Sequence, residues 1–135
     1  MPADFAPSGS PPLTILAVDD DAAVLRFLDH VLHEAGYRVL LADGGRRAIE
    51  TYENNSQPVH LLLTDVIMPD LTGPVVAERL CARQPGLQVL FMSDYHDADL
   101  AQRFVANRGF TLLPKPFTVE GLLRSVEESL SGVER

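Results

Sequence analysis

Five short, largely apolar runs, separated by segments with helical spacing, constrain the fold of this chain more than any other feature. The runs cover residues 13–18, 37–41, 59–64, 87–92 and 110–113. Apolar residues recur at helical spacing over about 24–35, 44–54, 76–84, 97–107 and 119–130. Runs without polar alternation are typical of parallel strands that helices cover on both faces. Because crossovers between such strands are right-handed, the pattern predicts an α/β fold with a doubly wound, five-stranded parallel sheet.

The length of 135 residues predicts a single domain, which we place at residues 13–131 with a tail at 132–135. Residues 1–12 are rich in Pro, Ser and Gly and are expected to form a disordered leader or linker. They lack the basic start and the apolar stretch of a secretory signal. No apolar run reaches the length of a membrane span, so no membrane association is expected.

The charge balance excludes some classes of partner. The chain has 11 Lys and Arg against 19 Asp and Glu, and its formal net charge is −8. An acidic chain of this kind is not expected to bind nucleic acid directly or to attach to an anionic membrane. Its one cysteine, Cys81, falls in an apolar helical pattern, so we expect a buried thiol and a cytoplasmic protein without a disulfide.

Polar side chains stand at the ends of four of the five predicted strands. Asp19 and Asp20 follow the first run, Asp65 the third, Ser93 the fourth and Lys115 the fifth. In doubly wound sheets, ligands bind beyond the carboxyl ends of the strands. Three carboxylates at one edge repel each other, and a hard divalent cation such as Mg²⁺, or Mn²⁺, relieves that repulsion. The lysine and the serine hydroxyl can each donate to a phosphate oxygen.

This combination indicates phosphoryl chemistry. A carboxylate can attack phosphorus and form an aspartyl-phosphate, while the other groups neutralise charge and align the transfer. No Gly-rich phosphate loop with a lysine is present, so a nucleotide is not the expected donor. Each residue also has an ordinary explanation, since the acids at 19–21 or Ser93 can cap a helix, Asp65 can form an Asx-turn and Lys115 can be solvated. Their occurrence at one sheet edge favours a common site.

Four segments carry a resemblance to a known family. They are ILAVDDD at 15–21, LLLTDVIMPDLTG at 61–73, VLFMSD at 89–94 and LLPKPF at 112–117. In order and spacing the chain resembles the receiver domain of two-component response regulators, either stand-alone or of the type attached to hybrid sensor kinases. The resemblance implies a flavodoxin-like sheet with strand order 2-1-3-4-5.

The resemblance also implies a set of site residues. Asp65 is the phosphoacceptor and a metal ligand. Asp20 is expected to ligate Mg²⁺ directly, Asp19 mainly through a metal-bound water, and Ile67 through its backbone carbonyl. Ser93 and Lys115 would stabilise the phosphoryl group.

In the same resemblance, the Lys115–Pro116 peptide bond is expected to be cis. The donor that the resemblance implies is a histidine kinase or a histidine phosphotransfer protein. Phosphorylation is then expected to switch a surface around the helix at 97–107 and the strand at 110–113, which would bind an unknown downstream protein. The same face, with the helix at 119–130, is a possible homodimer interface. Such a domain is not an enzyme beyond its own phosphorylation and dephosphorylation.

Two positions depart from the commonest family pattern. Asp94 stands where a small Ala or Gly usually follows the serine, and its carboxylate can obstruct the donor, repel phosphate or bind the cation. Alternatively, Asp94 points to solvent and caps the helix at 97–107. Leu112 stands where an aromatic switch residue is common. Tyr95 is an alternative aromatic gate, or a surface residue.

Two rival functions are considered. One is an interaction module that works without phosphorylation, which Asp94 and Leu112 favour. The other is a phosphohydrolase with an aspartyl-phosphate intermediate. Such enzymes usually need a general acid two residues after the nucleophile, and this chain has Ile67 there.

Overall fold

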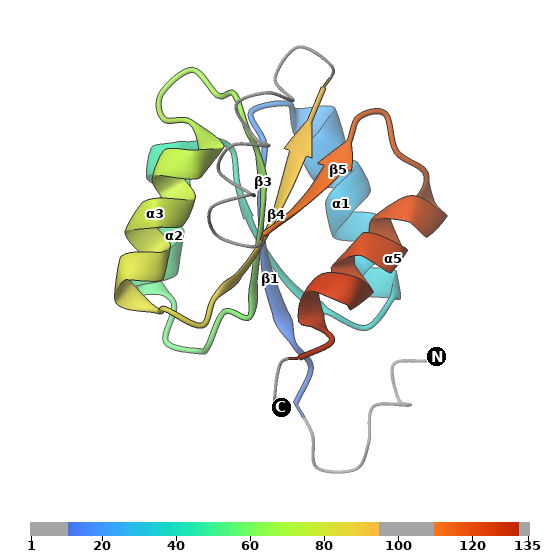
Figure 1. Ribbon diagram of the computed structural model, residues 1–135, viewed down its shortest axis with the longest axis horizontal. Coiled ribbons are helices and arrows are strands. Elements are labelled where there is room, and N and C mark those ends of the chain that lie inside the picture. Colours follow the sequence, from blue (N-terminus) through green and yellow to red (C-terminus); the bar gives the residue numbers. More distant parts are fainter. Residues whose placement is uncertain (1–10, 95–109, 133–135) are drawn as a thin grey trace.

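The sheet has the predicted number of strands and the predicted connectivity. A computed structural model describes residues 11–94 and 110–132, in which five parallel strands lie in the order β2-β1-β3-β4-β5 (Figure 1). The strands are β1 (Thr14–Val18), β2 (Arg38–Ala42), β3 (Leu61–Asp65), β4 (Gln88–Ser93) and β5 (Thr111–Pro114). This order confirms the doubly wound, flavodoxin-like sheet, and each strand lies within one or two residues of its predicted run.

Four helices are described. They are α1 (Ala22–Glu34), α2 (Gly45–Asn54), α3 (Gly73–Arg83) and α5 (Val119–Leu130). Helix α3 begins three residues before the first apolar position that indicated it, because the Thr72 hydroxyl accepts from the Val75 N–H and Pro74 fits the first turn, where no N–H is needed. The helix predicted at 97–107 lies outside the described residues.

The helices cover both faces of the sheet, as predicted. Alternate strand residues point to opposite faces, so in β1 Leu16 packs with α2 and α3 and Ile15 packs with α1 and α5. Figure 1 shows α2 and α3 on one side of the sheet and α1 and α5 on the other. Each side has its own buried apolar cluster. In the first of them Cys81 is buried, as its helical pattern indicated.

The parallel arrangement brings the loops that follow the strands to one edge of the sheet. In Figure 1 the strands point upward, so their carboxyl ends and the first turns of the described helices lie at the top. The residues at 19–21, 43–44, 66–72 and 115–118 therefore gather above the sheet. Within the described part of the chain, no helix combines the length and the apolar character that a membrane crossing needs.

Candidate functional site

Main-chain hydrogen bonds extend the sheet just past the strand ends and hold the predicted site residues in place. The N–H of Asp19 donates to the Ala42 carbonyl at 3.2 Å, and the N–H of Lys115 donates to the Ser93 carbonyl at 2.8 Å. Asp65 is itself the last residue of β3. The backbones of Asp19, Asp65, Ser93 and Lys115 are therefore fixed by the ladder, and their side chains emerge at the same edge.

The three acids form one cluster of oxygen atoms. Asp19, Asp20 and Asp65 each offer a carboxylate oxygen, and these three atoms lie within 4.8 Å of one another. Asp19 and Asp65 are buried, whereas Asp20 is exposed and leaves the cluster open to solvent. The third acid of the run at 19–21 has a different role. Asp21 caps α1, because its carboxylate accepts from the Ala23 N–H at 2.8 Å, whereas Asp19 and Asp20 belong to the cluster.

Lys115 joins two of these acids. Its Nζ lies 2.9 Å from Asp19 Oδ2 and 3.3 Å from Asp65 Oδ1, and its side chain is 24% exposed. The alternative of a solvated surface lysine is therefore wrong. Burial alone would lower the pKa of the Lys115 ammonium, but its hydrogen bond with Asp19 and the negative charges of Asp65 and Asp19 together raise that pKa above its usual value.

The cluster carries more negative charge than the lysine balances. Burial first, and then the charge of Asp19, raise the pKa of the Asp65 carboxyl to about 6, although Lys115 opposes this shift. Three ionised carboxylates and one ammonium leave a net charge of −2 in the cluster. A hard divalent cation matches both this charge and the all-oxygen donor set, so the residues fit Mg²⁺ or Mn²⁺.

Other predicted site residues lie in or just after β4 and β5. Ser93 is buried, and its hydroxyl donates to the carbonyl of Asp94 at 2.9 Å. Asp94 is exposed at the end of β4. Leu112 is half-buried against the cluster formed with α2 and α3. The Lys115–Pro116 peptide bond is cis, the geometry that the family resemblance implied.

The expectations for Ile67 and Tyr95 stay predictions. Ile67 lies in the loop after β3 with its side chain 44% exposed, and the use of its carbonyl as a ligand is untested. Tyr95 lies outside the described residues.

Asp70 is a contact residue that the sequence reasoning missed. Its carboxylate accepts from the N–H groups of Gly45 at 3.0 Å and Arg46 at 2.9 Å, at the start of α2. These backbone donors, that of Arg46 foremost, lower the pKa of the Asp70 carboxyl. A signal for it existed, because Gly44 precedes α2 without any side chain that could cap the helix.

Gly73 is a second residue that was missed. A Cβ atom at this position would lie 2.3 Å from the backbone carbonyl oxygen of Asp65. Its own N–H donates to the Val66 carbonyl at 2.7 Å. A glycine is therefore required for the loop to close back on the end of β3.

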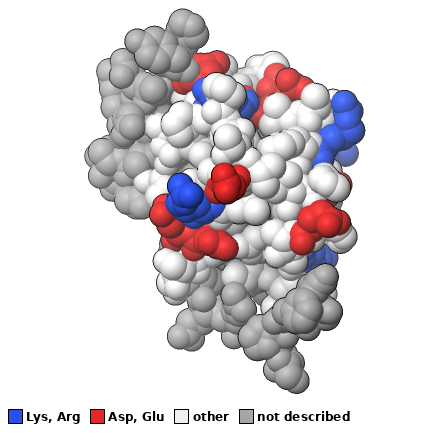
Figure 2. Space-filling view, turned by 90° about the vertical axis from the view of Figure 1, so that its right-hand side faces the viewer, with Lys and Arg blue, Asp and Glu red and all other residues white. Residues whose placement is uncertain are grey.

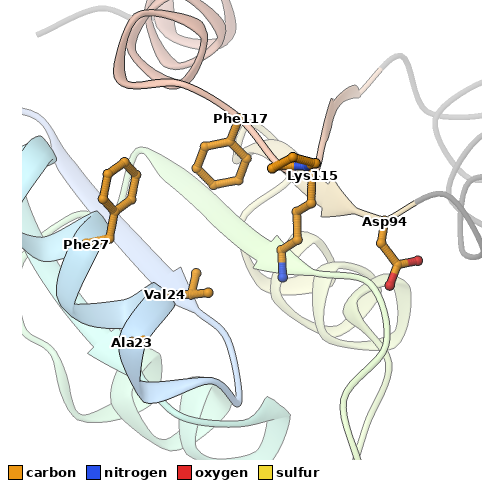
Figure 3. A pocket seen from close by; sticks show the side chains of 7 residues that line it. Ala23, Val24, Phe27, Asp94, Lys115 and Phe117 are labelled. Carbon is orange, nitrogen blue, oxygen red and sulfur yellow. The ribbon is translucent and has the colours of Figure 1, made fainter.

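An apolar groove opens beside the cluster. It has a volume of about 490 Å³ and is lined by Ala23, Val24, Phe27, Asp94, Lys115, Pro116 and Phe117. Figure 3 shows the rings of Phe27 on α1 and of Phe117, which lies before α5, and places the Lys115 side chain between these rings and Asp94. The two ring centroids are 6.1 Å apart. On the face that Figure 2 shows, charged side chains lie near the top and in a band across the middle of the view, with a largely uncharged area between them.

The chain matches known proteins over most of its length. A family model described as the response regulator receiver domain matches residues 15–127. The response regulator receiver protein CpdR of Brucella abortus (strain 2308) is 34% identical over 116 residues, which cover 86% of this chain and 95% of that protein. The sensor kinase CckA of the same strain is 33% identical over 117 residues, which cover 87% of this chain and 12% of the kinase. The chain thus spans nearly all of the first protein and a small part of the second.

The comparison with solved structures also finds a receiver domain. A response regulator receiver domain protein (CheY-like) from Methanospirillum hungatei JF-1 superposes with a TM-score of 0.80 at 28% identity. The superposition covers 89% of this chain and 94% of that one.

Proposed function

The chain belongs to the response regulator receiver family, the signal-receiving modules of two-component systems, and from this premise we propose that Asp65 is its phosphoacceptor. The observation that carries the proposal is the pair of contacts from Lys115 to Asp19 and to Asp65, within a carboxylate cluster that suits a divalent cation. Asp19, Asp20, Asp65 and the Ile67 carbonyl would hold Mg²⁺ or Mn²⁺.

Asp65 acts as the nucleophile. One of its carboxylate oxygens attacks phosphorus, and the bond from phosphorus to the imidazole nitrogen of a phosphohistidine breaks as the new P–O bond forms. Because the pKa of Asp65 is raised only to about 6, the carboxyl is largely ionised above neutral pH and needs no base. A divalent cation held by Asp19, Asp20 and Asp65 would offset negative charge on the transferred oxygens and on these carboxylates.

Lys115 and Ser93 stabilise the product. The ammonium already lies 3.3 Å from Asp65 Oδ1, so it can follow the phosphoryl group with a short movement. In the unphosphorylated chain the Ser93 hydroxyl donates to the Asp94 carbonyl. After phosphorylation it can turn and donate to a phosphoryl oxygen instead. That turn, together with Leu112 and Tyr95, is the switch we propose for the downstream surface.

The donor is a histidine kinase or a phosphotransfer protein. The apolar groove supports this choice, because Lys115 lines the groove and also reaches Asp65. A protein with an apolar surface that covers Phe27 and Phe117 would place its phosphohistidine next to the acceptor. The downstream partner, a homodimer through the face of the helix expected at 97–107, β5 and α5, a cytoplasmic location and intrinsic dephosphorylation by water belong to the same proposal.

The test is phosphoryl uptake from a small acyl- or amido-phosphate with Mg²⁺, followed by intact-mass measurement. The wild-type chain is expected to gain one phosphoryl group and Asp65→Asn none. Asp29→Asn is the matched control, since Asp29 is an exposed acid on α1 and its change removes the same charge. Loss of uptake in both variants, or in neither, would contradict the role of Asp65.

A second candidate function keeps the fold without the chemistry. Asp94 is exposed at the end of β4, where it adds a further negative charge beside the entrance to the acceptor. A chain that binds Mg²⁺ and is folded, but takes up no phosphoryl group from either a small donor or a phosphohistidine protein, is a phosphorylation-independent interaction module.

A further inference from the structure

The start of helix α2 takes its cap from another loop of the chain. Gly44 occupies the capping position and has no side chain to offer. Asp70 accepts from the Gly45 N–H with Oδ1 and from the Arg46 N–H with Oδ2. These two donors precede Asp70 in the sequence by 25 and 24 residues. Its Oδ1 also accepts from the Leu71 N–H at 2.8 Å, which fixes the carboxylate relative to its own loop. Both oxygens are thus engaged by main-chain donors.

The contact between this loop and α2 is close on both sides of the carboxylate. A Cβ atom at Gly45 would lie 2.6 Å from Leu71 Cβ, and one at Gly44 would lie 3.3 Å from Asp70 Oδ2. The loop therefore packs so closely against the first turn of α2 that there is no room for a side chain at Gly45. The far end of the loop is held as well, because the Gly73 N–H donates to the Val66 carbonyl at 2.7 Å.

The residues between these two attachment points include Ile67. A polar pocket of about 390 Å³ has both Asp20 and Asp70 in its lining, with Arg46 and Arg47 on its α2 side. The attachment by Asp70 therefore lies next to the acidic cluster. The segment that leads from Asp65 through Ile67 is thus fastened to α2 just beside the place where the cation would bind.

We propose that Asp70 is a positioning residue for the cation site. It holds the loop after β3 against α2, so that the Ile67 carbonyl and the Asp65 carboxylate keep the arrangement that a divalent cation needs. Asp70 itself touches neither the cation nor the phosphoryl group. The inference rests on the proposed function, because it takes the acidic cluster to be a cation site.

Removal of the attachment should weaken cation binding more than it weakens the fold. Loss of a residue that orients metal ligands costs a site about tenfold to a hundredfold in affinity. Asp70 acts through the loop rather than on a ligand directly, so we expect about tenfold in Asp70→Ala. Asp70→Asn keeps one acceptor oxygen, so its loss should be smaller than that of Asp70→Ala, about threefold.

Gln84→Ala is the matched control. Gln84 also ties elements together, since it accepts from the Tyr52 hydroxyl of α2 at 2.8 Å and donates to the Val59 carbonyl at 2.8 Å. These contacts lie at the C-terminal ends of α2 and α3, at the opposite edge of the sheet. This variant should lose stability without a change in cation affinity.

The experiment is calorimetric titration of Mg²⁺ into the wild-type chain and the three variants, with thermal unfolding of each. The expected order of dissociation constants is wild type equal to Gln84→Ala, then Asp70→Asn, then Asp70→Ala. An affinity in Asp70→Ala equal to that of the wild type, or an equal loss in Gln84→Ala, would overturn the inference. If Asp70→Ala does not fold, the threefold loss in Asp70→Asn carries the test.

Phosphoryl uptake separates this inference from the proposed function. In Asp70→Ala the Mg²⁺ concentration at half-maximal rate should rise about tenfold, in line with the affinity, while the rate at saturating Mg²⁺ stays close to that of the wild type. A wild-type chain that binds Mg²⁺ but takes up no phosphoryl group would contradict the proposed function and leave the calorimetric comparison as the test of Asp70. A wild-type chain that binds no Mg²⁺ would overturn the inference.

Discussion

Lys115 and Asp19 are 96 residues apart in the sequence, and the lysine ammonium donates a 2.9 Å hydrogen bond to a carboxylate that is 1% exposed. This pair joins the loop after β5 to the loop after β1 across the edge of the sheet. Asp19 also accepts the Asp21 N–H at 2.9 Å, so its two oxygens hold the start of α1 and the lysine at once. The lysine is thus the main positive charge of the acidic cluster until a cation binds.

The first prediction concerns that charge. Lys115→Met keeps an apolar stem but leaves Asp19 and Asp65 without their ammonium partner. We expect a loss of about 1–3 kcal/mol in the free energy of unfolding in chelator at pH 7.5, because a buried acceptor loses its donor. Phosphoryl uptake should also fall by at least about tenfold, since a charge-assisted contact to the phosphoryl group is lost. Denaturant unfolding and intact-mass time courses measure the two effects.

Arg83→Met is the control for the first prediction. Arg83 pairs with Glu53 at 3.1 Å, but both side chains are largely exposed and lie away from the cluster. An exposed pair of this kind contributes about 0–1 kcal/mol. Equal losses in the two variants would mean that the lysine has no special place in the site.

The second prediction is a pH dependence of stability without metal. The pKa of Asp65 is about 6 in the folded chain against about 3.9 in an unfolded one, so the folded state holds the proton more tightly. The free energy of unfolding contributed by this group is therefore highest below pH 4 and falls as the pH rises to 6. The fall should be of the order of 2 kcal/mol.

Other acids also titrate in this range, so the comparison must be with Asp65→Asn. The variant should be more stable than the wild type at pH 7.5 in chelator and close to it at pH 4. Mg²⁺ at pH 7.5 should stabilise the wild type more than the variant, because a cation binds only the folded carboxylate cluster. A stability difference that is the same at both pH values would contradict the raised pKa.

The fold could be predicted from the sequence because its signals are local. The apolar runs give the strands, the helical spacing gives the helices, and the polar residues after the runs give the edge of the site. The family resemblance supplied the strand order. Strand and helix ends moved by a few residues where capping decided them, as at Thr72, which starts α3 earlier than its apolar spacing indicated.

The contacts between loops could not be predicted in the same way. Gly44 indicates that the cap of α2 must come from elsewhere, but no local pattern identifies Asp70 as that cap. Nor does any local pattern indicate that Gly73 must pass close to the Asp65 carbonyl, because both contacts depend on how distant segments meet. The ionisation of Asp65 likewise depends on burial and on the distance to Asp19, which the sequence does not give.

The third prediction follows from the close approach at Gly73. Gly73→Ala would place a Cβ atom 2.3 Å from the Asp65 carbonyl oxygen, so the loop must move. We expect a loss of about 1–3 kcal/mol in the free energy of unfolding and weaker Mg²⁺ binding. Gly121→Ala is the control. Gly121 lies in the first turn of α5, where alanine favours the helix, and its Cβ would lie 3.2 Å from the hydroxyl of the capping residue Thr118. A Gly73→Ala chain as stable as Gly121→Ala would contradict the steric argument.

The fourth prediction concerns Asp94. Removal of its charge in Asp94→Ala should speed phosphoryl uptake from a small anionic donor about fivefold, because an exposed like charge near the acceptor costs about 1 kcal/mol. The difference should shrink as the salt concentration rises, since screening weakens the repulsion. The control is Asp29→Ala, because Asp29 is an exposed acid on α1. This variant should leave the rate of phosphoryl uptake unchanged at both low and high salt. Slower uptake in Asp94→Ala would instead indicate that the carboxylate assists the cation.

The last prediction concerns the apolar groove. Phe27 is 37% exposed, so Phe27→Ala should fold, yet its ring forms the groove with Phe117. We expect transfer from a phosphohistidine protein to lose about tenfold in kcat/KM, as for an aromatic contact residue, while uptake from a small phosphodonor is unchanged. Val75→Ala on α3 is the control, because Val75 is 36% exposed and lies on a helix that packs on the opposite face of the sheet. A kinase or phosphotransfer protein that phosphorylates both variants at the wild-type rate would show that the donor does not use this groove.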